Sequence, residues 1–156
     1  MKFPRASGVL LHPTSLPGPY GIGEIGPEAD RFADFLQATG QHLWQILPLG
    51  PTSFGDSPYQ SPSTFAGNPL WISFDLLIKD KLLHKSQLKN FPVFPADKVD
   101  FGPVIEARFA VLRKVCETFT ARATPELQAE FAEFCRHNAG WLDDYALFSA
   151  LKDAHG

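Results

Sequence analysis

The chain has 156 residues, a length that fits one domain with material for a sizeable hydrophobic core. With 44% hydrophobic and 20% charged residues, the composition is that of an ordinary globular chain and excludes an intrinsically disordered one. The formal net charge is −3 and no basic run exceeds two residues, which argues against a nucleic-acid partner, and no apolar stretch is long enough to cross a bilayer.

The first fifty residues predict a strand, a helix and a second strand. Residues 6–11 (ASGVLL) form a short apolar run, and a loop rich in Pro and Gly follows it. Pro27 suits the first turn of a helix, apolar residues recur at helical spacing after it, and Gly40 ends it. Residues 42–47 (HLWQIL) predict the second strand. A strand–helix–strand unit of this length implies a parallel sheet.

The pattern changes after residue 50. A polar and aromatic loop precedes residues 70–74 (LWISF), for which the sequence predicts a strand. Residues 76–88 predict one or two short helices, and residues 90–103, which contain three prolines, predict irregular backbone.

The C-terminal third predicts three helices. The first spans residues 104–122 and is amphipathic, and the second runs from residue 125 to about 137 after the capping residue Thr124. The third spans residues 141–152, and its side chains expected to be buried are Leu142, Tyr145, Phe148 and Leu151.

Two cysteines, Cys116 and Cys135, lie in helical sequence without a CxxC or His-spaced ligand pattern. We therefore expect buried or half-buried free thiols and a reducing, cytoplasmic location. The sequence implies neither a metal nor an organic cofactor.

Residues 54–68 (FGDSPYQSPSTFAGN) are the most informative segment. Aromatic rings alternate there with small hydroxyl side chains, one acid and two carboxamides, and Gly55, Pro58 and Pro62 keep the segment from extending. Flat aromatic faces beside neutral donors and acceptors suit a sugar. The alternative is an ordered loop whose aromatic side chains fill the core, and composition alone favours that interpretation.

A dinucleotide site is a weaker candidate. Gly21, Gly23 and Gly26 match GxGxxG, but nine residues separate them from the preceding strand and Glu24 would repel a pyrophosphate. We therefore assign these glycines to a loop and to the entry of a helix.

Two acid–base candidates are also weak. His12 ends the first strand, where barrel enzymes place functional groups, but a lone histidine is more often structural. Asp143 and Asp144 are adjacent on a predicted helix and point in different directions, so we assign them to a solvated face.

Three segments carry a family resemblance: LLHPTSLPGPYGIGEIG, WQILPLGPTSFGDSPYQSPSTFAGNPLWI and WLDDYALFSALKDAHG. They closely resemble the N-terminal part of the amylomaltases, the bacterial 4-alpha-glucanotransferases (disproportionating enzymes). The resemblance runs in order through nearly the whole chain, and only residues 79–123 match in character alone.

This resemblance implies an enzyme that transfers α-1,4-glucan segments by a retaining mechanism. One carboxylate attacks the anomeric carbon to form a glycosyl-enzyme, another group acts as acid and then base, and the acceptor is the 4-hydroxyl of another glucan. In the family the catalytic carboxylates come from later barrel strands, beyond Gly156. We therefore expect no catalytic residue in this segment and no transferase activity from it alone.

The fold class implied by the resemblance is α/β, specifically the N-terminal part of a (β/α)8 TIM-type barrel with an inserted, mainly helical subdomain. Residues 1–50 are expected to supply the first barrel strands and helix, and residues 51–75 the glucan-contacting loop and the following strand. Residues 76–156 are expected to form the inserted subdomain.

The resemblance also implies substrate-binding residues, with maltooligosaccharides and other α-1,4-glucans as partners. Tyr59 corresponds to the tyrosine that lies against the sugar at the cleavage point, and Ser57 matches a serine that borders neighbouring donor sugars. Phe54 stands where some relatives carry a tyrosine in an accessory glucan-binding groove. Asp56 and Gln60 are expected to shape the loop or to support the contact residues.

Two alternatives remain open. The chain could be a non-catalytic glucan-binding module that uses the same loop, which requires that the chain folds alone. It could also be a truncated segment without function, which predicts exposed strand edges and aggregation.

Overall fold

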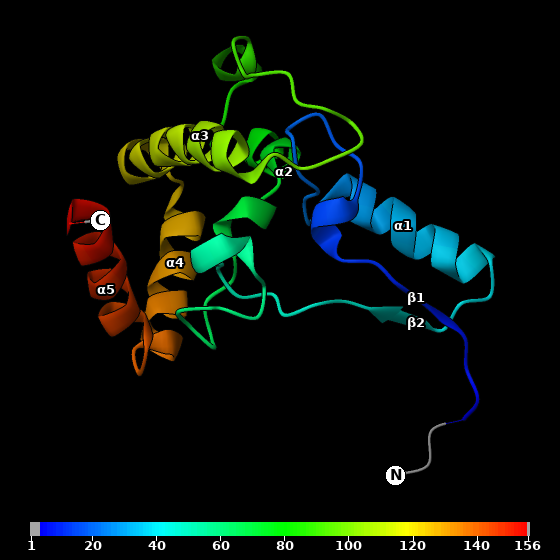
Figure 1. The fold of residues 1–156 in the computed structure, drawn as a ribbon. Helices are drawn as coiled ribbons and strands as arrows, with labels where there is room; N and C mark the ends of the chain where they lie inside the picture. The colour runs from blue at the N-terminus through cyan, green and yellow to red at the C-terminus, as the bar shows by residue number, and fades with distance from the viewer. Residues whose placement is uncertain (1–3, 156) are drawn as a thin grey trace.

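The computed structural model describes residues 4–155 and contains a two-stranded parallel sheet (Figure 1). Strand β1 (Gly8–Leu10) pairs with β2 (Leu43–Gln45), so that Gly8 lies opposite Leu43 and Leu10 opposite Gln45. Helix α1 (Pro27–Ala38) makes the crossover between the two strands. The predicted strand–helix–strand unit is confirmed, although each strand is shorter than the apolar run that predicted it.

The ends of α1 follow the predicted signals. Pro27 occupies the first helical position, where a missing backbone N–H costs nothing, and two acidic residues stand in the first turn. At the other end Gly40 adopts φ +69°, and the Gln41 N–H then donates to the Leu36 carbonyl at 2.8 Å. This left-handed residue lets the chain turn back toward β2.

The sheet itself encloses no core within the described residues. Leu10 is 59% exposed and Leu43 is 58% exposed, although both lie on paired strands. Most of the buried apolar residues gather instead around α3 (Phe101–Arg122), in two clusters. The first cluster contains Phe74, Leu83, Val111, Leu112 and Val115, and the second contains Ile22, Leu70, Trp71 and Val104.

The predicted strand at residues 70–74 is wrong. Pro69–Trp71 forms a 3₁₀ turn, and helix α2 (Phe74–Lys79) starts three residues later. Two side chains favour these turns because they accept backbone N–H groups: Asn68 Oδ1 from Leu70 at 2.9 Å, and Ser73 Oγ from Leu76 at 3.4 Å. The apolar residues are thus buried from helical turns, and one bridge between Ile25 and Ile72 is the only strand-like pairing of this segment with the rest of the described chain.

The segment between α2 and α3 is mostly as predicted. Beyond α2 a 3₁₀ turn covers Lys85–Leu88, and irregular backbone follows. Helix α3 begins at Phe101, three residues earlier than predicted, with Pro103 in its first turn. Proline is tolerated there because the N–H groups of a first turn have no partner within the helix.

Helices α4 (Pro125–Asn138) and α5 (Leu142–His155) run beside each other, away from the sheet (Figure 1). The predicted cap is confirmed, since Thr124 Oγ1 accepts the Leu127 N–H at 3.3 Å. The predicted burial along α5 is wrong: of its described side chains, Leu142 and Tyr145 are half-buried and Phe148 and Leu151 are exposed. One side of α5 borders an open cleft instead of a core.

The cysteines also differ from expectation in part. Both are free thiols; Cys135 is half-buried as expected, whereas Cys116 is exposed on α3. It lies outside the buried stripe of this helix, which includes Val111, Leu112 and Val115.

Candidate functional site: an aromatic and polar cleft

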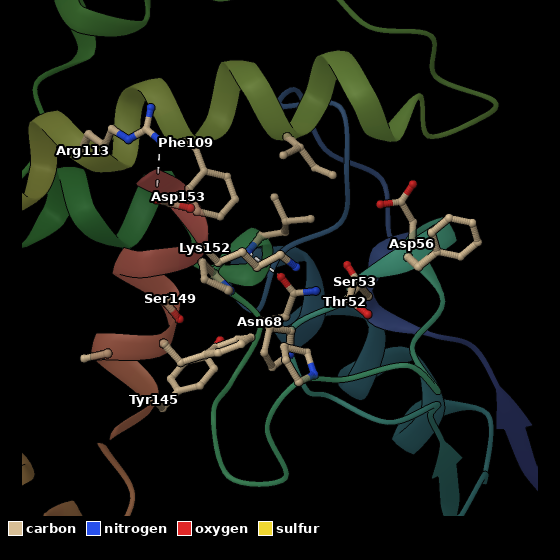
Figure 2. A pocket seen from close by; sticks show the side chains of 18 of the residues that line it. Thr52, Ser53, Asp56, Asn68, Phe109, Arg113, Tyr145, Ser149, Lys152 and Asp153 are labelled. Atoms are coloured by element: carbon tan, nitrogen blue, oxygen red, sulfur yellow. Dashed lines mark hydrogen bonds and ion pairs between the residues drawn. The ribbon is translucent and has the colours of Figure 1, made fainter. Parts of the chain in front are cut away.

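A cleft of about 1010 Å³ lies between α3, α5 and the segment 51–70 (Figure 2). Its size is at the upper end of ordinary ligand sites, which suits an oligomeric ligand better than a single small molecule. The lining side chains from α3 are Ile105, Glu106, Phe109 and Arg113, and those from α5 include Leu142, Tyr145, Phe148, Ser149, Lys152 and Asp153. The segment 51–70 contributes Thr52, Ser53, Phe54, Asp56, Pro62, Asn68 and Leu70, among others.

The loop that borders the cleft is shaped by its own hydroxyl side chains. Ser53 Oγ donates to the Gln60 carbonyl at 2.7 Å, and Ser57 Oγ accepts the Tyr59 N–H at 3.3 Å. Ser61 Oγ likewise donates to the Ser63 carbonyl at 2.7 Å. Small hydroxyl side chains commonly satisfy turn backbone in this way. These serines therefore fix the loop conformation before any ligand is present.

A left-handed pair of residues turns the loop at its tip. Gly55 has φ +68° and Asp56 has φ 54°, within the 3₁₀ turn Phe54–Asp56. Glycine and aspartate are residue types that tolerate this conformation. The turn leaves the Phe54 ring 87% exposed at the edge of the cleft.

The structure brings only some of the predicted site residues to the cleft. Phe54 and Asp56 line it, whereas Ser57, Tyr59 and Gln60 stand outside its lining in the described part of the chain. Tyr59 is nevertheless 72% exposed, so its ring is open to solvent on the same loop. The hypothesis that the loop aromatics fill the core is wrong for Phe54 and Tyr59, and Phe65 is exposed as well.

The cleft also contains residues that sequence reasoning did not select. Asn68 is only 8% exposed, its Oδ1 accepts the Leu70 N–H, and its amide points into the cleft in Figure 2. Phe109 and Tyr145 face the cleft from α3 and α5. The sequence predicted burial for Tyr145 and an amphipathic helix around Phe109, and helical spacing alone does not distinguish a helix face on a core from one on a cleft.

A row of aromatic rings connects the loop to α5. Phe65 stacks on Trp141 with ring centroids 5.8 Å apart, and Trp141 is followed by Tyr145 at 6.2 Å and Phe148 at 6.4 Å. These separations are within the range of favourable aromatic pairs. Of these four rings, Tyr145 and Phe148 line the cleft, and Trp141 and Phe65 extend the row beyond its lining toward the loop.

Charges in the cleft nearly balance. Three carboxylates (Asp56, Glu106, Asp153) and two cations (Arg113, Lys152) line it. Arg113 and Asp153 form an ion pair at 3.9 Å between α3 and α5, and because both side chains are largely exposed this pair contributes little stability. Aromatic faces, neutral polar groups and balanced charge suit a neutral polyhydroxylated ligand.

A buried ion pair lies at the junction between the loop around residue 24 and α3. Arg108 Nη1 donates to Glu24 Oε1 at 2.7 Å, and Arg108 Nη2 donates to the Ile72 carbonyl at 2.7 Å. The guanidinium also sits 4.2 Å from the centroid of the Phe74 ring. Burial raises the pKa of the Glu24 carboxyl, against the opposing charge of Arg108. Burial likewise lowers the pKa of the Arg108 guanidinium.

The same junction explains the glycines of the GxGxxG pattern. Gly21 has φ +79° and lies under the Phe94 ring, and a Cβ at Gly23 would collide with the Pro13 carbonyl. Glu24 is engaged with Arg108. These residues pack a loop, in agreement with their assignment from sequence.

His12 packs against Trp71 with ring centroids 5.3 Å apart in an edge-to-face arrangement. Its Nδ1 and the Trp71 Nε1 are buried and have no hydrogen-bond partner among the described residues, and burial lowers the pKa of His12. This packing agrees with a structural role for the histidine. Within residues 4–155 there is no cluster of three or more His, Cys, Asp or Glu side chains that could hold a metal ion.

None of the helices in the described range is both long and apolar enough to cross a membrane.

Comparison with known proteins identifies the family. A family model described as 4-alpha-glucanotransferase matches residues 11–156. The chain is 49% identical over its full length to a 4-alpha-glucanotransferase of Thermus thermophilus, and 47% identical over 97% of its length to one of Synechocystis sp.; it spans about 30% of each.

A solved structure, an amylomaltase from Streptococcus agalactiae in complex with acarbose, superimposes with a TM-score of 0.88 and 44% sequence identity. The match covers 97% of this chain and 30% of the amylomaltase chain. The α/β arrangement described above is therefore shared with an amylomaltase. Given the family match over nearly its whole length, the chain belongs to the 4-alpha-glucanotransferase family.

Proposed function

We propose that this chain forms part of the glucan-binding cleft of a 4-alpha-glucanotransferase, which transfers α-1,4-glucan segments between maltooligosaccharides. The observation that carries the proposal is the family match through residues 11–156, which includes the whole cleft. The chemistry of the cleft supports it, because exposed rings beside neutral donors suit the apolar faces and hydroxyl rims of glucose units. The related amylomaltase was solved with acarbose bound, which agrees with a saccharide ligand.

For the whole enzyme we propose a (β/α)8 barrel in which β1 and β2 are the first strands. The exposed Leu10 and Leu43 on this short sheet support further apolar packing against it. We also propose the division into barrel elements (1–50), glucan-contacting segment (51–75) and helical subdomain (76–156). Reaction by a retaining glycosyl-enzyme mechanism belongs to the same proposal, with no catalytic carboxylate assigned to this chain.

Within the loop we propose that Tyr59 stacks on a glucose unit and that Ser57 borders a neighbouring one. The 72% exposure of the Tyr59 ring supports this role. Asp56 and Gln60 are proposed to shape the loop, which agrees with the left-handed backbone of Asp56 and with the bond from Ser53 to the Gln60 carbonyl. Phe54 is proposed to contact a glucan at the rim of the cleft.

The test is binding of maltoheptaose to the protein, measured by titration calorimetry. We expect binding by the wild type, and about tenfold weaker binding by Tyr59→Ala because a stacking contact of roughly 1.4 kcal/mol is removed. Phe35→Ala is the matched control, since Phe35 is an exposed ring on α1 outside the cleft. An unchanged dissociation constant for Tyr59→Ala would remove Tyr59 from the site.

The same residue should matter in a complete enzyme. There we expect Tyr59→Ala to cut the rate of glucan transfer sharply and to leave the fold intact, because the ring is exposed. This chain by itself is expected to release no glucose from maltotriose, since no nucleophile or acid–base pair is assigned to it.

A second candidate function is a glucan-binding module without catalysis. The observation that favours it is that both buried clusters gather around α3 and do not need the sheet. This candidate predicts a single cooperative thermal transition for the chain together with maltoheptaose binding. The remaining alternative, a segment without function, predicts aggregation and no binding.

We also propose a reducing compartment such as the cytoplasm, because both cysteines are free thiols and Cys116 is exposed.

A further inference from the structure

We propose that Arg108 is a positioning residue for the glucan cleft. It connects α3, which supplies one part of the cleft lining, to the backbone of Ile72, directly after the turn Pro69–Trp71 at the end of the segment 51–70. This inference rests on the proposed function. It concerns a fully buried side chain that does not line the cleft among the described residues.

The first step is that Arg108 connects three separate parts of the chain. Its backbone belongs to α3, and its side chain donates from Nη1 to Glu24 Oε1 and from Nη2 to the Ile72 carbonyl, each at 2.7 Å. The guanidinium face lies on the Phe74 ring. Because the guanidinium is planar and rigid, two donors aimed at two partners fix its position and its orientation together.

The second step is that Glu24 is itself held in place. Its carboxylate accepts the Phe74 N–H, at 3.3 Å to Oε2, at the start of α2. Arg108 is therefore attached to a carboxylate that is anchored by backbone, rather than to a mobile surface group. The pair is a rigid bridge between α3 and the start of α2.

The third step is that residues next to this bridge line the cleft from two segments of the chain. Ile105 and Phe109, three residues before and one residue after Arg108, belong to the α3 wall. Ile72 directly follows the turn Pro69–Trp71, and Pro69 and Leu70 of that turn also line the cleft. Leu70 belongs to the buried cluster against which Ile105 and Phe109 pack. A change in how Arg108 holds Ile72 should therefore shift these two parts of the cleft lining relative to each other.

The fourth step is that stability alone is a poor explanation for this pair. Removing two charges from water costs free energy that their attraction only partly returns, so apolar replacements of buried ion pairs are often as stable. Arg108 Nε also has no hydrogen-bond partner among the described residues. Placement of the cleft walls is a function that an apolar pair could not perform, because only the guanidinium reaches both acceptors.

The experiment compares Arg108→Lys with Arg108→Met. Lysine keeps a cation that can reach Glu24, but it lacks the planar fork that also serves Ile72. We expect Arg108→Lys to remain folded and to bind maltoheptaose about fivefold more weakly, close to the Arg108→Met value, because the lost hydrogen bond positions the wall. Arg122→Lys, the same exchange at an exposed site on α3, is the matched control and should bind like the wild type.

A second measurement reads the walls directly. In protein with isotope-labelled isoleucine methyl groups, Arg108→Lys should shift the NMR signals of Ile72 and Ile105, and Arg122→Lys should leave both unchanged. If the wild type fails to bind maltoheptaose, the proposed function fails, and these methyl shifts still decide whether Arg108 sets the cleft walls.

The proposal is overturned if Arg108→Lys keeps the wild-type dissociation constant and both methyl signals. It is also overturned if Arg108→Lys binds maltoheptaose like the wild type while Arg108→Met binds much more weakly. A positive charge at residue 108 would then be sufficient for binding, without the second hydrogen bond to Ile72. If neither variant folds, the pair is a requirement of folding rather than of cleft geometry, and the proposal is again overturned.

Discussion

The buried junction around Arg108 and the exposed loop at residues 51–68 use polar groups in opposite ways. In the junction, charged side chains are removed from water and bond to each other and to one carbonyl. In the loop, hydroxyl side chains satisfy their own backbone, and aromatic rings face solvent. The comparison teaches that groups which can touch a ligand directly lie in the loop, whereas the junction can act on the ligand only through the backbone that it holds. Substitutions of loop side chains should therefore change binding with little effect on stability, and substitutions in the junction should change stability or the position of the cleft lining.

The largest expected contrast is between two phenylalanines. Phe74 is fully buried against the Tyr20 and Phe91 rings, so Phe74→Ala should lower the free energy of unfolding by about 3–5 kcal/mol. Phe54→Ala, at an 87% exposed ring, should change it by less than about 0.5 kcal/mol. Urea denaturation of both variants measures the difference, and equal losses would abolish the distinction between the two regions.

Two glycines give a smaller contrast of the same kind. Both have positive φ, but a Cβ at Gly21 would lie 2.6 Å from the Phe94 ring, whereas a Cβ at Gly55 would meet nothing within 4 Å. We expect Gly21→Ala to cost roughly 2–4 kcal/mol, from backbone strain and overpacking, and Gly55→Ala roughly 1 kcal/mol from strain alone. Thermal unfolding of the two variants tests this order, and a larger cost at Gly55 would contradict it.

Alkaline pH should lower the free energy of unfolding through Tyr20, whose ring packs against Phe74 beside the Arg108 junction. Burial, and then the charges of Asp75 and Glu24, raise the pKa of its phenol from the ordinary 10.0 to about 12. Above the ordinary value the unfolded chain loses this proton before the folded chain does, so rising pH favours unfolding. The stability of the wild type relative to Tyr20→Phe should therefore fall as pH rises from 10 toward about 12. Denaturation curves for both proteins across this pH range measure the change. A difference in free energy of unfolding that stays constant with pH would refute the raised pKa of Tyr20.

The smallest expected effect is a gain at the rim of the cleft. Phe54→Tyr keeps the ring and adds a hydroxyl that can bond to a glucan, so it should strengthen maltoheptaose binding by about fivefold or less. The free energy of unfolding should stay the same, because the position is exposed. Calorimetric titration of the variant tests this, and weaker binding would show that the added hydroxyl finds no hydrogen-bond partner on the glucan.

Much of the fold could be predicted because its signals are local. Pro27 and Gly40 mark the ends of α1, and Thr124 marks the start of α4, through backbone groups within a few residues. The apolar segment at residues 70–74 misled the prediction because its burial depends on distant contacts with Ile22 and Val104. Asn68 and Ser73 carried the local signal that favours turns there.

Only the loop part of the candidate site could be predicted from the sequence, because its mixture of aromatic and small polar residues indicates a sugar-binding surface. Arg108 was missed, although it occupies the same helical stripe as Val104, Val111 and Leu112, where a charged residue requires a buried partner. Glu24, its partner, is 84 residues away in sequence, and no spacing rule connects them. The half of the cleft formed by α5 was hidden because an apolar helix face looks the same whether it borders a core or a cavity.

The hydroxyl bonds within the loop have a thermodynamic consequence for ligand binding. Ser53, Ser57 and Ser61 already hold the loop backbone in the absence of a ligand. The conformational entropy of the loop is therefore lost during folding and not when a glucan binds. Association should then proceed without a slow rearrangement, and the entropy of binding should carry little contribution from the chain itself. A preorganised loop of this kind selects its ligand by shape, since it has little freedom to adapt to a different one.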